Sequence, residues 1–226
     1  MTKNVQNQEE VIVAEAVSKT EKFFEQNGKK VMIILAAVVI VLASVVGYKF
    51  LIVDKNEQAA AELIVAAQEH FKGETPNYEL ALNGDESGAG LLDVIEQYGS
   101  TKAGNLAKHY AGICYLRLGK FEEAESYLKK FSTVGGSHIG EIINAQNLGL
   151  QGDVAVELEK YEEAAKLFAK AVKQSNNNYT APYYLYKQAL ALVAAGKAEE
   201  AKECCQAIIE KYPNSIEKNA AEKLLY

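Results

Sequence analysis

The chain has 226 residues, of which 49% are hydrophobic and 24% are charged, and its formal net charge is −6 at pH 7. This length allows one domain of ordinary size and an extension, and the hydrophobic content excludes a wholly disordered chain. The acidic balance and the lack of a basic stripe argue against nucleic acid as a partner. Three prolines and no tryptophan, with abundant Ala, Glu, Lys and Leu, favour long helices, so we expect an all-α fold.

Residues 1–30 precede a long apolar stretch and form the first expected segment, a cytoplasmic tail. Its apolar residues fall on one face of a helix, and Asn27-Gly28 predicts the end of that helix. The residues of this face are Val13, Ala16, Val17, Thr20 and Phe24. Two interpretations stay open, namely an amphipathic helix on the membrane surface or a partner, and a frayed, helix-prone tail.

Residues 31–53 carry the strongest signal in the chain. The segment Val31 to Tyr48 contains no charged residue, and a helix of this length spans about 27 Å, close to the roughly 30 Å of hydrocarbon in a bilayer. Lys49 interrupts the run before it continues to Val53, and a lysine near a helix end can extend its ammonium to the headgroups. We therefore predict one transmembrane helix over 31–53, because the stretch is too long for a typical signal peptide.

The lysines that flank this helix predict its orientation. Two follow the apolar stretch, Lys49 and Lys55, whereas four precede it, namely Lys19, Lys22, Lys29 and Lys30. Positive residues concentrate on the cytoplasmic side of single-pass proteins. We expect the N-terminus in the cytoplasm and the rest of the chain outside it.

Residues 54–104 are expected to form a membrane-proximal degenerate hairpin and a loop. A stripe of Ala60, Leu63, Ala67 and Phe71 predicts a helix that continues from the transmembrane segment. The segment after this helix, FKGETPNYELALNGDESGAG, has the Pro, Asn-Gly and Gly-Ala-Gly pattern of a loop. A short helix then carries its own apolar face, made of Leu91, Val94, Ile95 and Tyr98.

Residues 105–214 contain three related segments, each with two amphipathic helices around a tight turn. The turns fall at Gly119-Lys120, Glu159-Lys160 and Gly196-Lys197. Small residues recur where the two helices of a hairpin meet, since helices pack at ~8–10 Å only if the contact side chains are small. These residues are Gly112, Gly152 and Ala189 in the first helices and Ala124, Ala164 and Ala201 in the second. Residues 215–226, with Ile216, Ala220 and Leu224 in line, predict a closing helix.

These phased positions resemble the tetratricopeptide repeat, including an aromatic after the turn at Phe121 and Tyr161. The resemblance implies a right-handed solenoid of helical hairpins, with loop insertions at SHIGEI and NNNYT. The second segment departs from the pattern with Glu159 at the turn glycine, and the third with Ala198 in place of the aromatic.

The stretch from Ala81 to Ala124 also resembles the ancillary subunit of the bacterial Sec translocon, a membrane-anchored protein with a periplasmic, chaperone-like repeat domain. The resemblance implies a bacterial inner-membrane protein whose repeat domain is periplasmic, with proteins or unfolded polypeptides and Sec components as partners. The same family grades into coordinators of cell division and outer-membrane assembly, which is the alternative function. Neither the client nor the oligomeric state follows from the sequence.

Catalytic signatures are missing from the sequence, and we expect a protein that is not an enzyme and has no cofactor or metal site. The histidines, His70, His109 and His138, are scattered without metal-ligand spacing. Glutamate pairs recur at the start of each second helix, where carboxylates favour the positive helix end. Cys114, Cys204 and Cys205 indicate no disulfide framework and suit buried positions.

In stacked helical hairpins the first helix of each pair lines the concave face, where partners bind. The pattern projects onto that face a set of apolar, aromatic and polar side chains that suit a peptide. Tyr183 and Tyr186 are expected to form an aromatic platform within this set. The full set is Leu106, His109, Ile113, Leu116, Gln146, Asp153, Val156, Tyr183, Tyr186, Leu190 and Val193.

Overall fold

The computed structural model describes residues 2–71, 75–86 and 88–225, with only the backbone described for residues 2–20 and Phe24. The described chain is mostly helical and divides into two compact units, one ending at Lys55 and one beginning at Asn56. The first unit is a long helical segment, and the second contains the shorter helices and the two strands.

The first unit contains helix α1 (Thr2–Tyr48) and a π-helical segment η1 (Lys49–Val53). The side chains of its apolar stretch are exposed, as Ile33 and Val41 illustrate, and none in the most apolar window is buried by protein. Residues Glu25–Glu69 form a helical stretch that is long and apolar enough to cross a membrane.

The predicted end of the first helix at Asn27-Gly28 is wrong, because α1 continues through both residues. Glycine inside a helix costs only about 1 kcal/mol relative to alanine, which the neighbouring helical residues can offset. The Asn27 side chain donates a hydrogen bond to the Phe23 carbonyl, 3.2 Å away, and so stays within the helical pattern. The expected amphipathic face of residues 13–24 lies outside the side chains that the structure describes.

The second unit opens within α2 (Asp54–Glu69), whose first two residues belong to the first unit. It continues with α3 (Tyr78–Asn83), a two-stranded antiparallel hairpin of β1 (Gly84–Asp85) and β2 (Gly88–Ala89), and α4 (Leu91–Tyr98). The expected loop over 71–90 is therefore wrong in part, since it contains α3 and the hairpin. Asn77 caps α3 by accepting a hydrogen bond from the Leu80 amide at 3.0 Å, and α3 buries Ala81 and Leu82. A cap and two core residues stabilise a helix that glycine and proline spacing did not predict.

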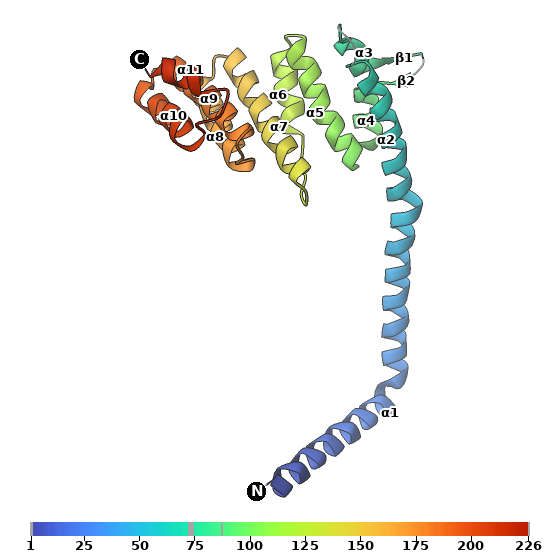
Figure 1. The fold of residues 1–226 in the computed structure, drawn as a ribbon. Helices are drawn as coiled ribbons and strands as arrows, with labels where there is room; N and C mark the ends of the chain where they lie inside the picture. Colours follow the sequence, from blue (N-terminus) through green and yellow to red (C-terminus); the bar gives the residue numbers. More distant parts are fainter. Residues whose placement is uncertain (1, 72–74, 87, 226) are drawn as a thin grey trace. The chain divides into compact units, whose positions relative to one another are not determined.

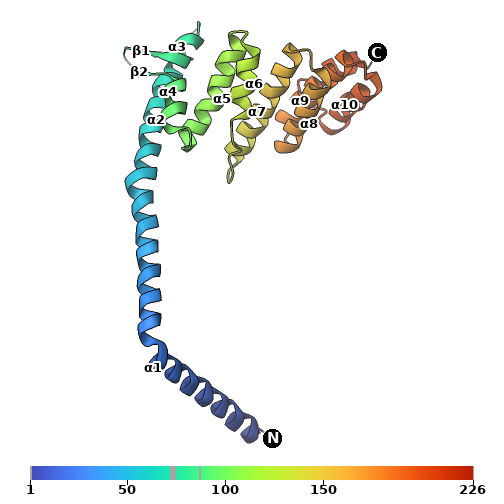
Figure 2. The ribbon, with the colours of Figure 1, turned by 180° about the vertical axis from the view of Figure 1, so that it is seen from behind.

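Three helical hairpins and a last helix complete the chain. The helices are α5 (Lys102–Arg117), α6 (Phe121–Lys129), α7 (His138–Glu157), α8 (Tyr161–Gln174), α9 (Thr180–Ala194), α10 (Ala198–Lys211) and α11 (Lys218–Leu224). Each packs against the next in the chain, and Figures 1 and 2 show the hairpins side by side in sequence order. Ile216 is 94% exposed and precedes the last helix, so it does not join the expected closing face. That helix instead buries Ala221.

All three hairpins turn in the same way. Gly119, Glu159 and Gly196 have φ of 71°, 57° and 75°, a left-handed conformation. In the first turn the Lys120 amide donates to the Tyr115 carbonyl at 2.9 Å and the Gly119 amide to the Leu116 carbonyl at 3.2 Å, and the other two turns repeat this pattern. This is the Schellman motif, which favours glycine at the left-handed position. Glu159 therefore occupies a position that strains its backbone.

Glycines in the first helices allow the second helices to pack closely. A Cβ at Gly112 would lie 2.5 Å from Cγ of Leu128, and one at Gly152 would lie 2.6 Å from Cε1 of Phe168. Both large side chains are buried. Small residues in the phased positions thus make room for one large side chain in each of these hairpins, as close helix packing requires.

Candidate protein-binding groove

A groove with a volume of about 730 Å³ crosses the first helices of the three hairpins. Helices α5, α7 and α9 supply most of its walls, and the first turn contributes its edge. Its lining consists of Ile113, Leu116, Arg117, Gly119, Phe121, Gln146, Gly149, Leu150, Asp153, Val156, Glu157, Tyr183, Tyr184 and Lys187.

A charged pair joins two walls of the groove. Nζ of Lys187 on α9 lies 2.7 and 2.8 Å from the two carboxylate oxygens of Asp153 on α7. The same ammonium lies 4.8 Å from the centroid of the Tyr183 ring, within cation–π range. Burial lowers the pKa of Lys187, but the hydrogen bonds to Asp153 and Tyr183 outweigh it, and the pKa is raised overall. Lys187 is therefore a charged and fixed donor within the groove.

Two adjacent tyrosines form the α9 wall. The rings of Tyr183 and Tyr184 meet edge to face with centroids 5.1 Å apart. Tyr184 is buried against α7 at Gly149, where a Cβ would lie 2.3 Å from Cε1 of the ring. Gly149 therefore admits Tyr184 between the second and third hairpins, and this contact holds the exposed Tyr183 ring at the groove surface.

Six residues of the expected concave face line the groove, namely Ile113, Leu116, Gln146, Asp153, Val156 and Tyr183. Leu190 and Val193 are exposed on α9 but do not line it. Leu106 and Tyr186 are half-buried against the hydrophobic core. The expected platform of Tyr183 and Tyr186 is therefore replaced by the pair of Tyr183 and Tyr184.

His109 does not lie on an open surface. The residue is 2% exposed, its Nδ1 is 3.1 Å from Nδ2 of Asn147, and its ring packs against Tyr110 and Phe131. Burial lowers the pKa of His109 to about 4, although a hydrogen bond with Gln146 opposes the shift. This enclosed imidazole, neutral at pH 7, joins α5 to α7 and leaves almost no surface exposed.

The groove also contains residues that the sequence pattern missed, above all Arg117, Glu157 and Lys187. Each is close in sequence to an expected groove residue: Arg117 comes directly after Leu116, Glu157 is four residues after Asp153, and Lys187 is four residues after Tyr183. Helical spacing was thus a usable signal for the last two. Asp153 was the one charged residue in the predicted set, and the other charged positions on the same helix faces were left out.

Among the residues that the structure describes, no group of three or more His, Cys, Asp or Glu side chains could hold a metal ion. Burial raises the pKa of the Cys114 thiol to about 12 and that of Cys204 to about 11, so both are protonated at neutral pH. Protonated, buried thiols are poor nucleophiles.

Models of one family match two segments of the chain. Both describe the tetratricopeptide repeat, at residues 111–133 and at residues 150–216. The matches support a tetratricopeptide-repeat family. Comparisons with curated proteins and with solved structures found no significant match.

The tetratricopeptide matches cover α6, most of the second hairpin and all of the third. Residues 134–149 fall between the two matched segments, and they include the second half of the α6–α7 loop and the first part of α7. Tetratricopeptide repeats are protein-binding scaffolds and generally not catalysts. The repeats and the groove across their first helices therefore indicate a scaffold for proteins.

Proposed function

We propose that this protein is a non-catalytic, membrane-anchored scaffold that binds extended segments of other proteins in the groove. The observation that carries the proposal is the combination of side chains that the three hairpins bring together. Tyr183 offers an aromatic face, Ile113 and Leu116 offer apolar surface, and Gln146 and Lys187 offer donors. Aromatic anchors with a few placed polar groups are typical of peptide-binding surfaces.

The anchor in this proposal is the transmembrane helix over 31–53. The exposed apolar side chains of α1 and its length support it. The excess of lysines before the helix supports a cytoplasmic N-terminus and a periplasmic repeat domain in the bacterial inner membrane. A reporter enzyme fused at the C-terminus tests this topology, and a cytoplasmic signal would contradict it.

The resemblance of residues 81–124 to the ancillary subunit of the Sec translocon supports a role in protein translocation or periplasmic chaperone networks. The alternative is a cell-envelope coordinator, in division or outer-membrane assembly, without chaperone activity. An assay of client aggregation with the purified full-length protein separates the two functions. A chaperone-like protein suppresses aggregation of an unfolded client at equimolar amounts, whereas a coordinator gives no protection.

Photo-crosslinking tests the groove in intact membranes. A photoreactive amino acid replaces Tyr183 in the groove in one variant and Val193 in a matched control. Val193 is on the same helix and is also exposed, but it lies outside the groove. We expect crosslinks to translocating or periplasmic polypeptides from position 183 and few from position 193. Equal crosslinking from both positions would refute groove binding, and capture of cytosolic proteins only would refute the periplasmic position of the repeat domain.

A further inference from the structure

The repeat array has two chemically different ends. One end, here the turn end, carries the three tight turns at Gly119, Glu159 and Gly196. The opposite end, here the loop end, carries the longer connections over 130–137 and 175–179 (Figure 1). Because the hairpin helices are antiparallel, α5, α7 and α9 begin at the loop end, and α6, α8 and α10 finish there.

The loop end is also the end of the repeat array that lies closest along the chain to the apolar segment 31–53. The Glu57 carboxylate on α2 accepts hydrogen bonds from the Lys102 amide, at 2.9 and 3.0 Å, at the first residue of α5. Glu57 comes four residues after Val53, the last residue of the predicted transmembrane helix. Four residues reach at most about 14 Å, whatever their conformation. If Val53 is at the membrane surface, the start of α5 is near that surface.

The loop end exposes large apolar side chains to solvent, both in its connections and at the start of α7. Ile139 is 71% exposed and Tyr179 is 88% exposed, and Val134 and Ile142 are also exposed. Val134, Ile139 and Ile142 belong to residues 134–149, between the two segments matched as tetratricopeptide repeats. Apolar side chains exposed at one end of the array offer a surface for contact with another apolar phase.

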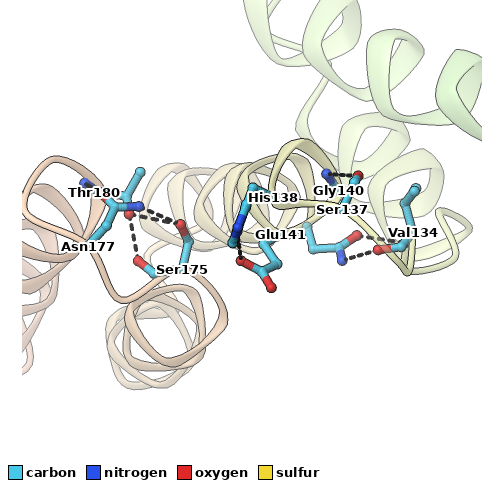
Figure 3. Close-up of polar contacts among 9 residues, drawn as sticks. Val134, Ser137, His138, Gly140, Glu141, Ser175, Asn177 and Thr180 are labelled. Carbon is cyan, nitrogen blue, oxygen red and sulfur yellow. Dashed lines mark hydrogen bonds and ion pairs between the residues drawn. The ribbon is translucent and has the colours of Figure 1, made fainter.

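Polar contacts hold these loops in place, so the exposed side chains are presented by a fixed backbone. The Asn144 side chain bonds both the amide and the carbonyl of Val134, at 2.8 and 2.9 Å. Ser137 caps α7 through the Gly140 amide at 3.0 Å (Figure 3). Asn105 at the start of α5 makes two more bonds to the Ser132 backbone, at 2.7 and 2.8 Å, and so ties the loop to the first hairpin.

The second loop is fixed in a similar way. Asn177 Oδ1 accepts hydrogen bonds from the Tyr179 and Thr180 amides, both at 2.9 Å. The Thr180 hydroxyl donates to the Ser175 carbonyl, and Figure 3 shows the contacts among Ser175, Asn177 and Thr180. This asparagine turn leaves the Tyr179 side chain in solvent. An apolar body with a polar hydroxyl suits the interface between lipid and water.

The two ends also differ in charge, with lysines at the loop end and glutamates at the turn end. Lysines occupy the last turns of α6, α8 and α10 at the loop end, at positions 129, 173 and 211. Glutamate pairs occupy the first turns of the same helices at the turn end. Lys129 is paired with Glu125 at 2.6 Å, whereas Lys211 lines a surface pocket together with Tyr179. Acidic groups occur at the loop end as well: Glu57 is bonded to the Lys102 amide, and Glu141 lies 3.2 Å from His138 and stays exposed. A lysine beside an exposed apolar side chain, as at Lys211 and Tyr179, matches an anionic lipid surface.

We propose that the loop end of the repeat array rests on the membrane surface, with Ile139 and Tyr179 in the headgroup region of anionic lipids. This inference rests on the proposed anchoring of residues 31–53, since the anchor brings the loop end to the bilayer. The contact is a second, reversible attachment. It fixes the distance between the groove and the membrane, and it turns the acidic turn end towards the solvent.

Tryptophan fluorescence tests the proposal directly, because the natural chain contains no tryptophan. Full-length variants Ile139→Trp, at the start of α7, and Tyr179→Trp, in the second loop, report the loop end, and Val193→Trp reports the turn end. Val41→Trp, within the apolar stretch, reports the anchor. Each variant is reconstituted into vesicles of phosphatidylethanolamine and phosphatidylglycerol, with and without brominated phosphatidylcholine as a quencher.

We expect brominated lipid to quench Val41→Trp, Ile139→Trp and Tyr179→Trp, and to leave Val193→Trp unquenched. The emission of the two loop-end variants should also shift to shorter wavelength on reconstitution, and replacing phosphatidylglycerol with a neutral lipid should reduce their quenching but not that of Val41→Trp. Quenching of Val41→Trp without quenching of either loop-end variant would overturn the membrane contact and leave the anchor intact, as expected if a protein covers the loop end. No quenching of Val41→Trp would refute the anchor itself.

Discussion

Lys187 and Asp153 form a bidentate ion pair, with Nζ 2.7 and 2.8 Å from the two carboxylate oxygens, and this pair connects the second and third hairpins inside the groove. Both side chains are about a quarter to a third exposed. The pair fixes the position of Lys187 beside the Tyr183 ring. Groove chemistry and hairpin packing therefore depend on the same contact.

This pair should show measurable coupling. Lys187→Met leaves the half-buried Asp153 carboxylate without a cationic partner. Asp153→Asn leaves the half-buried Lys187 ammonium without an anionic partner. We expect each change to lower the free energy of unfolding by about 1 kcal/mol, and the double variant to lose less than the sum of the two. Urea unfolding of the four proteins in detergent measures this cycle, and strictly additive losses would show that the pair contributes no coupling.

The left-handed turn residue Glu159 predicts a stabilising substitution. Glu159→Gly should raise the free energy of unfolding by about 0.5–1 kcal/mol, because glycine adopts φ near 57° without strain. The matched control is Gly119→Ala at the equivalent turn, where φ is 71° and a Cβ meets nothing within 4 Å. This control should destabilise by a similar amount through backbone strain alone. Thermal unfolding checks both, and a loss of stability in Glu159→Gly would contradict the turn assignment.

The glycine opposite Phe168 predicts a steric effect. Gly152→Ala places a Cβ 2.6 Å from Cε1 of the buried Phe168 ring, and the helices of the second hairpin must separate or the ring must move. We expect a loss of about 1–3 kcal/mol in the free energy of unfolding. Gly135→Ala, in a loop where a Cβ meets nothing within 4 Å, should be nearly neutral. Equal effects of the two substitutions in chemical denaturation would contradict the close packing at Gly152.

The buried imidazole predicts a pH dependence of stability. Burial lowers the pKa of His109 from 6.5 to about 4, so the unfolded chain binds a proton between these values and the folded chain does not. The stability associated with this group is complete above pH 6.5 and is lost as the pH falls towards 4, by up to about 3 kcal/mol. His109→Gln should flatten the slope of stability against pH in this window. Parallel slopes for the two proteins would show that His109 titrates normally in the folded state.

Local patterns in the sequence predicted the repeats well, because the hairpin contacts are local. Gly152 and Phe168 belong to the same hairpin, and their spacing in the sequence predicts the close contact between them that the structure shows. The turn positions at 119 and 196 follow from glycine alone. Helix α3 was missed because its stability comes from the Asn77 cap and from burial of Leu82 against other elements, which glycine and proline spacing does not report.

The composition of the groove was only partly predictable. The prediction assigned one face of each first helix to the concave surface. That face correctly included Ile113, Leu116 and Tyr183 of the groove, but it also included His109, which α7 covers. Whether a stripe residue faces the groove or the next hairpin depends on how neighbouring helices pack. Tyr184 illustrates this, because Gly149 on another helix creates the space that buries it. Such a pairing between distant positions is not visible in the periodicity of either helix.

The decisive measurement is the binding of an unfolded polypeptide to the full-length protein in nanodiscs. The fluorescence anisotropy of a labelled, permanently unfolded client gives the dissociation constants of the wild-type protein and of two variants, Tyr183→Ala in the groove and Val193→Ala outside it. If Tyr183 is a binding anchor, its removal should weaken binding by about tenfold or more, while Val193→Ala leaves the affinity unchanged. Equal affinities of all three proteins, or no binding by any of them, would contradict the proposal that the groove holds other proteins.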